Sequence, residues 1–325
     1  YTAARPTNAY IRIGYATSPD GVNWTKYNDP NTTGTLYADS DPVLIPGSSG
    51  SWDDRTVECS AVILEGGSYI MWYRGVDYAW NEGIGLATSI DGIDWNKDTQ
   101  NNPVLDPSPG GTWENDFLRL GSVVFDGSTY HMFYYAGAFY VDFRIGYAWS
   151  SDGLNWTKYD DPTTPNPPFA VSDPVLTWGS TGSWDDTQVL APCVILDPLT
   201  ATYKMWYTGE NGNLISGIGY ATAPITLNVP GNFPTIQAAI DAANDGNIVL
   251  VEEGTYYENI NFKGKAITVA SRFLVDGDTS HISNTIIDGS QPSHADSGSV
   301  VHFISGEDTT SVLCGFTITG GTGTI

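Results

Sequence analysis

The chain has 325 residues, of which 37 are acidic and 13 are lysine or arginine, so its formal net charge is −24. This excess of carboxylates argues against nucleic acid and anionic membrane surfaces as partners, because both are bound through cationic side chains. No apolar run reaches 18 residues, so no membrane insertion is expected. With 36 glycines, 19 tyrosines and 11 tryptophans, the composition predicts turn-rich β structure.

An internal repeat dominates the first two thirds of the chain. The tripeptide Ile-Gly-(Tyr/Leu) begins at residues 13, 84, 145 and 218. Four further anchors recur in a fixed order: Ser-x-Asp-Gly-x-x-Trp, Pro-Val-Leu, a turn with Gly-(Ser/Thr)-Trp, and Tyr-x-Met-(Trp/Phe)-Tyr. The Ser-x-Asp-Gly-x-x-Trp runs cover residues 18–24, 89–95 and 150–156, the turn tryptophans are Trp52, Trp113 and Trp184, and the last anchor starts at Tyr69, Tyr130 and Tyr203.

Each unit holds about four β-type runs separated by Gly, Pro, Asn and Asp turns. Four strands per unit, repeated radially, predict β-propeller blades. A solenoid is the alternative, but a period of more than about 60 residues is long for a solenoid unit. The Ser-x-Asp-Gly-x-x-Trp runs resemble the Asp box of sialidases, with one residue fewer between Asp and Gly. We expect Asp20, Asp91 and Asp152 to stabilise their own turns.

The combined anchors resemble the five-bladed-propeller glycosidases, a superfamily that includes arabinanases, β-xylosidases, invertases, levanases and mannoside phosphorylases. The resemblance covers about residues 8–227. It implies an active-site funnel on the propeller axis, with an Asp in the first blade, an Asp in the second and a Glu in the third. Two such carboxyl groups are what glycoside cleavage requires, one to protonate the leaving oxygen and one to attack or to activate water.

One position of the repeat carries a different residue type in each unit. The sixth residue after each turn tryptophan is Glu58, Arg119 or Leu190, which are three different chemistries at one place in the unit. The run Glu58-Cys59-Ser60-Ala61 resembles the Glu-Cys-Pro-Asp element that holds the general acid of invertase-like enzymes, with Ser and Ala in place of Pro and Asp. Glu58 is therefore the candidate general acid, and a solvated rim carboxylate is the alternative.

The same loops supply further candidates for contacts with a sugar. An arginine beside carboxylates can bind sugar hydroxyls or hold a carboxylate in its charged form. An exposed tryptophan can stack on a sugar ring, although burial between blades is an equal alternative for it. The candidate substrate-binding residues are Asp54, Arg55, Trp80, Asp116, Arg119 and Asp186. For the five charged residues among them, a role as solvated turn residues is an equal alternative.

Counting blades predicts an N-terminally truncated ring. Residues 10–24 are typical of the outer half of a blade, and three further units follow. In a five-bladed ring this places Glu58 in the third blade and both catalytic Asp positions upstream of Tyr1. We therefore expect about three and a half blades in residues 1–227, and no glycosidase activity from this chain alone.

A different pattern occupies residues 228–325. Ile236, Ala239, Ile240 and Ala243 share one face of a predicted short helix, and short β runs follow it. The run Pro-Thr-Ile-Gln-Ala-Ala-Ile, then Gly-Thr-Tyr-x-Glu-Asn-Ile and Gly-Phe-Thr-Ile-Thr-Gly-Gly, resembles the opening of a right-handed parallel β-helix of the pectin-lyase-like type. The helix would cap its first coil.

The acidic, lysine-poor composition, rich in tryptophan and tyrosine, is typical of a secreted bacterial protein, extracellular or at the cell surface. The resemblances imply an all-β fold with a polysaccharide or oligosaccharide as its partner. One function is a glycoside hydrolase-like propeller that acts on a glycan. The alternative is a non-catalytic protein, glycan-binding or surface-structural, and the regularity of the repeats favours it. No cofactor or metal site is expected: calcium has no specific motif here, and Asp276, Asp278 and Asp288 fit turns better than calcium ligands.

Overall fold

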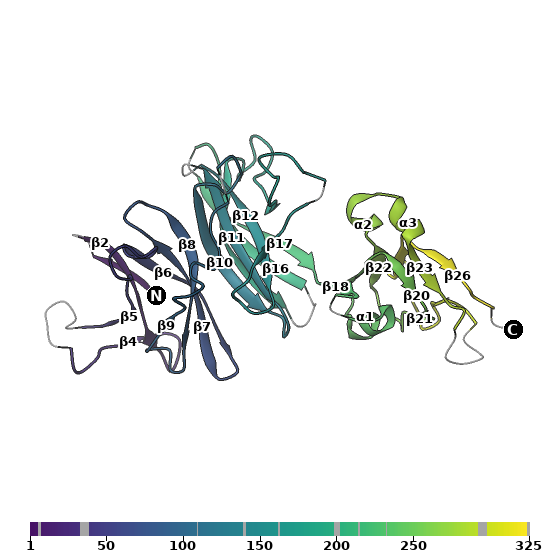
Figure 1. The fold of residues 1–325 in the computed structure, drawn as a ribbon, viewed down its shortest axis with the longest axis horizontal. Coiled ribbons are helices and arrows are strands. Elements are labelled where there is room, and N and C mark those ends of the chain that lie inside the picture. The colour runs from purple at the N-terminus through teal and green to yellow at the C-terminus, as the bar shows by residue number, and fades with distance from the viewer. Residues whose placement is uncertain are drawn as a thin grey trace. The chain divides into compact units, whose positions relative to one another are not determined.

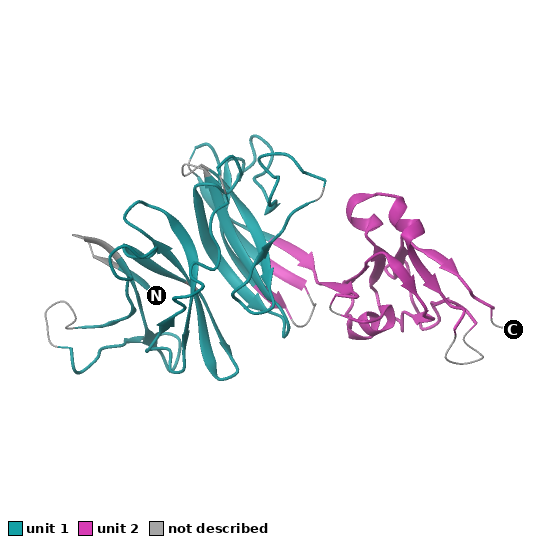
Figure 2. Ribbon diagram, in the orientation of Figure 1, with its two compact units in different colours: residues 1–194, 205–220 teal, residues 195–204, 221–325 magenta. Residues whose placement is uncertain are grey.

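The computed structural model describes residues 1–5, 8–32, 39–108, 110–138, 141–161, 163–197, 202–213, 215–231, 233–291 and 298–323. The chain divides into two compact units, residues 1–194 with 205–220, and residues 195–204 with 221–325 (Figure 2). No helix in these described ranges is long and apolar enough to cross a membrane.

The described residues of the first unit form successive antiparallel sheets in a propeller-like arrangement (Figure 1). We call these sheets blades A to D. Blade A consists of β1 (Thr2–Arg5), β2 (Asn8–Gly14) and β5 (Pro42–Leu44), continued by β3 (Ala16–Thr17) and β4 (Thr25–Lys26). Blade B consists of β6 (Thr56–Glu65), β7 (Ser68–Val76), β8 (Glu82–Ser89) and β9 (Asn96–Lys97).

Blades C and D repeat this order. Blade C consists of β10 (Phe117–Phe125), β11 (Tyr130–Ala138), β12 (Val141–Ser150) and β13 (Thr157–Lys158), with β14 (Pro174–Leu176) paired to β12. Blade D consists of β15 (Gln188–Asp197), β16 (Thr202–Glu210) and β17 (Ser216–Pro224). The predicted four-strand unit is confirmed in blades B and C. Blade A begins earlier than the predicted half-blade of residues 10–24, because β1, at residues 2–5, pairs with β2.

The Ser-x-Asp-Gly-x-x-Trp runs form turns, as predicted. In residues 89–95 the Asp91 Oδ1 atom accepts the backbone N–H groups of Ile93 and Asp94, each at 2.9 Å. The Trp95 indole donates to the Gly92 carbonyl at 2.9 Å. The runs at 18–24 and 150–156 repeat these bonds. The donated backbone hydrogen bonds lower the pKa of Asp91, so this carboxylate stabilises the turn in its charged form.

Large side chains fill the space between blades B and C. Trp72 of β7 is fully buried, and its indole donates to the Gly153 carbonyl of blade C at 3.0 Å. Its ring meets Tyr130 and Trp156 edge to face, with centroids 5.3 and 6.0 Å apart. The turn at residues 150–156 therefore also covers the preceding blade.

The second unit contains parallel strand pairs. One sheet joins β18 (Thr226–Val229), β19 (Ile248–Val251), β22 (Thr268–Ser271) and β25 (Val312–Cys314). A second joins β20 (Gly254–Tyr256), β23 (Thr285–Asp288) and β26 (Thr317–Thr319), and a third joins β21 (Ile260–Asn261) to β24 (Val301–His302). All these pairings are parallel. The expected domain boundary after residue 227 falls within β18.

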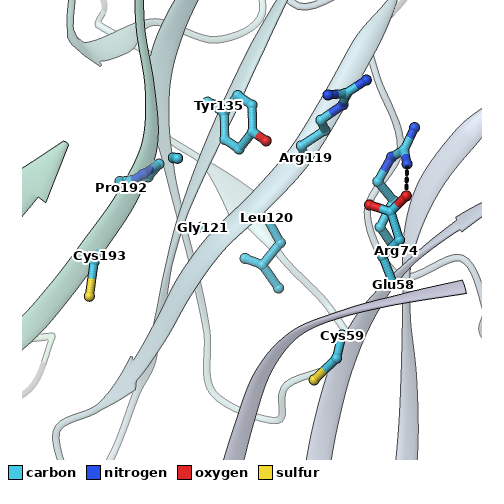
Figure 3. A pocket seen from close by; sticks show the side chains of 10 residues that line it. Glu58, Cys59, Arg74, Arg119, Leu120, Gly121, Tyr135, Pro192 and Cys193 are labelled. Atoms are coloured by element: carbon cyan, nitrogen blue, oxygen red, sulfur yellow. Dashed lines mark hydrogen bonds and ion pairs between the residues drawn. The ribbon is translucent and has the colours of Figure 1, made fainter. Parts of the chain in front are cut away.

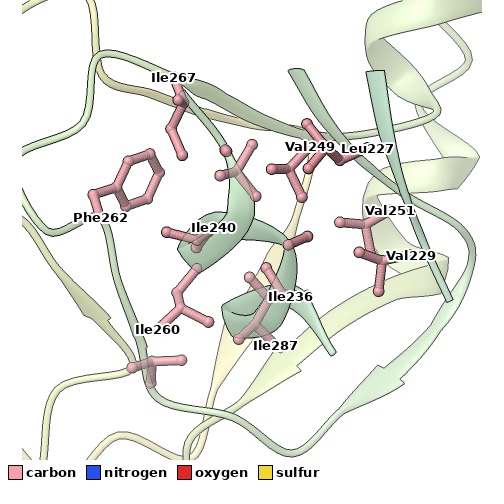
Figure 4. Close-up of a cluster of buried hydrophobic side chains, with 14 residues drawn as sticks. Leu227, Val229, Ile236, Ile240, Val249, Val251, Ile260, Phe262, Ile267 and Ile287 are labelled. Carbon is pink, nitrogen blue, oxygen red and sulfur yellow. The ribbon is translucent and has the colours of Figure 1, made fainter. Parts of the chain in front are cut away.

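Helix α1 (Ile236–Ala242) packs into this unit's apolar core (Figure 4). Its predicted apolar face is confirmed, since Ile236, Ala239 and Ile240 are fully buried. Glu258 accepts the first backbone N–H groups of the helix, from Ile236 and Gln237, each at 2.9 Å. The Glu of the Gly-Thr-Tyr-x-Glu run therefore satisfies donors that a helix N-terminus leaves open.

Two short helices, α2 (Phe273–Asp276) and α3 (Ser280–Asn284), lie between β22 and β23. Here Asp276 accepts the backbone N–H of Asp278, which in turn accepts that of Ser280, each at 2.8 Å. Asp288 accepts the backbone N–H of Ser290 at 2.9 Å. All three carboxylates thus have the turn roles that the sequence favoured.

His281 of α3 bridges two carboxylates, with Nδ1 2.8 Å from Glu253 and Nε2 3.0 Å from Asp276. Partial desolvation alone would lower the pKa of His281, but Glu253 and Asp276 outweigh it and raise this pKa above its ordinary value. The bridge should stabilise the fold fully below the ordinary pKa of histidine, about 6.5. We expect that contribution to be lost as the pH rises through the raised folded-state pKa.

An NMR titration of the imidazole protons checks this expectation, with the His281→Asn spectrum for assignment. The pKa of His281 should lie above 6.5 and fall when Glu253 is replaced by Gln. A value at or below 6.5 in the unaltered chain would contradict the bridge.

Candidate functional site

The repeat position that holds Glu58 and Arg119 lies on the first strand of each blade, β6 in blade B and β10 in blade C. Glu58 of β6 stands opposite Arg74 of β7, and Arg119 of β10 stands opposite Tyr135 of β11. These four side chains and part of β15 line a cavity of about 300 Å³ (Figure 3). Blades B, C and D thus all contribute to it, and its polar groups come from B and C.

Arg74 is the centre of the charged groups in blade B. Its Nη1 donates to Glu58 Oε1 at 2.8 Å, and its Nε donates to Glu82 Oε2 at 2.8 Å. Burial would lower the pKa of Arg74, but the charges of Glu82 and Glu58 outweigh it and raise the pKa. Arg74 is therefore a fixed cation that holds Glu58 at the cavity wall.

Glu82 is the second carboxylate that binds Arg74. Its side chain is almost fully buried, and its Oε1 accepts the backbone N–H of Leu118 at 2.8 Å. Leu118 belongs to β10, so Glu82 connects the ion pair of blade B to the inner strand of blade C. This bond therefore links the Glu58–Arg74 pair to the strand that carries Arg119.

The inner strands bend at the cavity. The pairing register of β6 shifts between Cys59 and Ala61, and that of β10 shifts between Leu120 and Ser122. A β-bulge redirects the side chains beside it. Gly121 is required at its bulge, because a Cβ there would lie 2.3 Å from the Pro192 carbonyl oxygen of β15. Blades C and D can approach this closely only at a glycine.

The structure separates the predicted site residues into groups. Glu58 and Arg119 line the cavity together, and Asp116, just before β10, is not among the lining residues. Asp54 accepts the backbone N–H groups of Gly50 at 2.7 Å and Tyr78 at 3.2 Å. Asp186 accepts those of Gly182 and Gly212 at 2.6 and 3.3 Å. The two carboxylates therefore occupy equivalent loop positions.

Arg55 and Trp80 form a pair of their own. The Arg55 guanidinium lies 3.2 Å from the centroid of the Trp80 ring. His131 of β11 has its Nδ1 atom 2.7 Å from the Tyr147 hydroxyl and its Nε2 atom 2.9 Å from Asp126 Oδ2.

Sequence reasoning missed Arg74, Glu82 and Tyr135. A signal for two of them was present: the fifth residue after the start of the Tyr-x-Met anchor is Arg74, Tyr135 or Thr208. This position varies among the units as the Glu58 position does, and the strand register places the two positions opposite each other.

Comparisons with known proteins give partial matches. No protein-family model matches the chain. It is 28% identical over 180 residues to the uncharacterized protein MT1551 of Mycobacterium tuberculosis (strain CDC 1551 / Oshkosh), covering 52% of each chain. It is 30% identical over 131 residues to the β-1,2-mannobiose phosphorylase of Thermoanaerobacter sp. (strain X514), covering 35% of this chain and 42% of that one. The chain thus spans about half the length, or less, of these curated relatives.

Among solved structures, the chain is similar to an N-acetylgalactosamine deacetylase from F. plautii in complex with blood group B trisaccharide. The TM-score is 0.44 at 19% identity, over 67% of this chain and 66% of that one. At this level of similarity the function has to be inferred from the chain's own residues.

Proposed function

We propose that this chain is part of a secreted, carbohydrate-active protein whose first unit binds an oligosaccharide at the cavity beside Glu58. One observation carries the proposal. In blades B and C the two positions that vary among otherwise regular blades meet at one cavity, where they present a carboxylate, two guanidinium groups and a phenol. Their counterparts in blade D, Leu190 and Thr208, are not among the lining residues. Charged and hydroxyl groups that converge on a cleft suit a ligand covered with hydroxyl groups.

The arrangement supports binding more directly than hydrolysis. Arg74 occupies Glu58 Oε1, which leaves Oε2 to accept a hydrogen bond from a sugar hydroxyl. Glycoside cleavage requires two carboxyl groups beside the bond that breaks. Among the described residues that line the cavity, Glu58 is the one carboxylate. We therefore propose that this chain binds sugars without cleaving them, and that Glu58 acts as a general acid only where a second carboxylate completes the site.

The mannobiose phosphorylase match agrees with a carbohydrate partner. Secretion is proposed on the composition, since acidic residues far outnumber lysine and arginine. A surface-structural role without a ligand is the alternative, and it predicts that the cavity binds no sugar.

We also propose the finer architecture. Three parallel sheets that recur along residues 226–319 support the first coils of a parallel β-helix. A ring of five blades is supported by Trp206 of blade D, which is 38% exposed, whereas its repeat equivalent Trp72 is fully buried by blade C. A further blade would cover Trp206 in the same way.

A glycan array followed by calorimetric titration tests the proposed function. Glu58→Gln should weaken binding of the sugars that the array identifies by roughly tenfold or more, because a hydrogen bond to a charged group contributes about 1.5–3 kcal/mol. Glu65→Gln, at the other end of β6, is the matched control and should leave binding unchanged.

Two results would overturn the proposal. One is a Glu58→Gln variant that binds every sugar as the unaltered chain does. The other is turnover of aryl glycosides by this chain that Glu58→Gln abolishes, which would replace binding by catalysis.

A further inference from the structure

We propose that Trp80, stacked on Arg55, is a separate subsite that binds the ring of a neighbouring sugar residue in an oligosaccharide. The inference rests on the proposed function of the Glu58 cavity. Arg55 precedes β6, the strand that carries Glu58, and its backbone N–H donates to the Val76 carbonyl at the end of β7, at 3.0 Å. Trp80 lies in the loop that joins β7 to β8.

The loop that carries Trp80 is held by its own hydrogen bonds. The backbone N–H of Asp77 donates to the Asn81 carbonyl at 3.0 Å, and that of Trp80 donates to the Asp77 carbonyl at 3.1 Å. The Asp77 carboxylate accepts both the backbone and side-chain N–H groups of Asn81, at 2.9 and 2.7 Å. Asp54 fixes the loop from outside through Tyr78. A ligand would therefore meet a preformed surface.

Blade D builds its equivalent loop with the same bonds. The backbone N–H of Asn211 donates to the Ile215 carbonyl at 3.2 Å, and Asn211 Oδ1 accepts the backbone N–H of Ile215. Asp186 fixes this loop through Gly212, as Asp54 does through Tyr78. The scaffold is thus a property of the repeat, and it does not explain the side chains that the loop of blade B displays.

The side chains that these loops display differ between blades B and D. Arg55 and Trp80 occupy the places that Thr187 and Leu214 have in blade D, and Leu214 lies outside the described residues. The arginine–tryptophan pair therefore occurs on the same blade as Glu58. Blade B therefore differs from blade D both at Glu58 and at this pair.

Trp80 combines an unfavourable backbone conformation with an exposed side chain. Its φ is +70°, a left-handed conformation that is unfavourable for a bulky side chain and that concentrates at functional sites. Its side chain is 61% exposed, so it belongs to no core. Arg55 covers one face of the ring and orients it by a cation–π contact. The other face suits the apolar C–H face of a sugar ring.

Binding of short and long sugars separates this subsite from the cavity. We would titrate the chain with a disaccharide and a hexasaccharide from each of the mannose, xylose and arabinose series. Trp80→Ala should weaken hexasaccharide binding by roughly tenfold, as the loss of a buried aromatic anchor does, and should leave disaccharide binding within about twofold. Trp24→Ala is the matched control, because Trp24 is equally exposed at 62% and lies in a turn of blade A.

Fluorine NMR of the chain labelled with 5-fluorotryptophan gives a direct readout, with Trp80→Phe used for assignment. The Trp80 resonance should shift on addition of the hexasaccharide, while resonances of the other tryptophans report an intact fold.

An unshifted Trp80 resonance, or unchanged hexasaccharide affinity in Trp80→Ala, overturns the subsite if Glu58→Gln still weakens binding. Weaker binding in Trp80→Ala with no effect of Glu58→Gln overturns the cavity proposal instead. Failure of the unaltered chain to bind any of the six sugars counts against both.

Discussion

Trp72→Ala is expected to lower the free energy of unfolding of the first unit by about 3–5 kcal/mol, the range for removing a buried large aromatic side chain. Trp72 is fully buried, and its indole hydrogen bond to Gly153 joins blade B to blade C. Truncation leaves a cavity between Tyr130 and Trp156 and an unpaired carbonyl. Urea unfolding followed by circular dichroism measures the change.

Trp206→Ala is the control for this variant. Trp206 holds the same repeat position in blade D but is partly exposed. We expect it to cost about 1 kcal/mol or less, since surface substitutions rarely cost more. Equal losses in the two variants would contradict the account, because the position would then matter for the blade itself and not for the contact between blades.

Arg74→Gln is expected to cost about 3–5 kcal/mol, as breaking a buried ion pair by removing one partner does. The substitution leaves the buried Glu82 carboxylate without its cation, although its bond from Leu118 remains. The same denaturation experiment measures the loss. Glu58→Gln should cost much less, because the Glu58 side chain is 29% exposed and can be solvated.

Rescue identifies the cause of that loss. Glu82→Gln removes the uncompensated charge while its amide oxygen still accepts the Leu118 N–H. Combining Arg74→Met with Glu82→Gln should therefore recover more than half of the stability that Arg74→Gln loses. No recovery would show that Arg74 stabilises the blade by packing and not by pairing with Glu82.

The sequence predicted the blades well because their anchors are local. A turn such as residues 89–95 is stabilised by bonds among neighbouring residues, so its pattern recurs wherever the turn does. The apolar face of α1 was predictable for the same reason. By contrast, α2 and α3 have four and five residues, too few for a helical period to become visible.

The candidate site was predictable only in part. Variation among repeats identified Glu58 and Arg119, and both line the cavity. Arg74 was missed although its repeat position varies among the units, because only the strand pairing places it opposite Glu58. Glu82 was missed because its bonds, to Arg74 and to the Leu118 N–H of blade C, are encoded by neither spacing nor composition. The loop role of Asp54 is evident from its hydrogen bonds, since it accepts the backbone N–H groups of Gly50 and Tyr78. Asp186 accepts those of the equivalent residues Gly182 and Gly212.

A crystal structure of the chain with its tightest-binding oligosaccharide tests the central claim most directly. We predict sugar density in the cavity, with one hydroxyl about 3 Å from Glu58 Oε2 and a second sugar ring against the open face of Trp80. A sugar bound elsewhere on a chain whose Glu58–Arg74 pair is intact would contradict the assignment of this cavity.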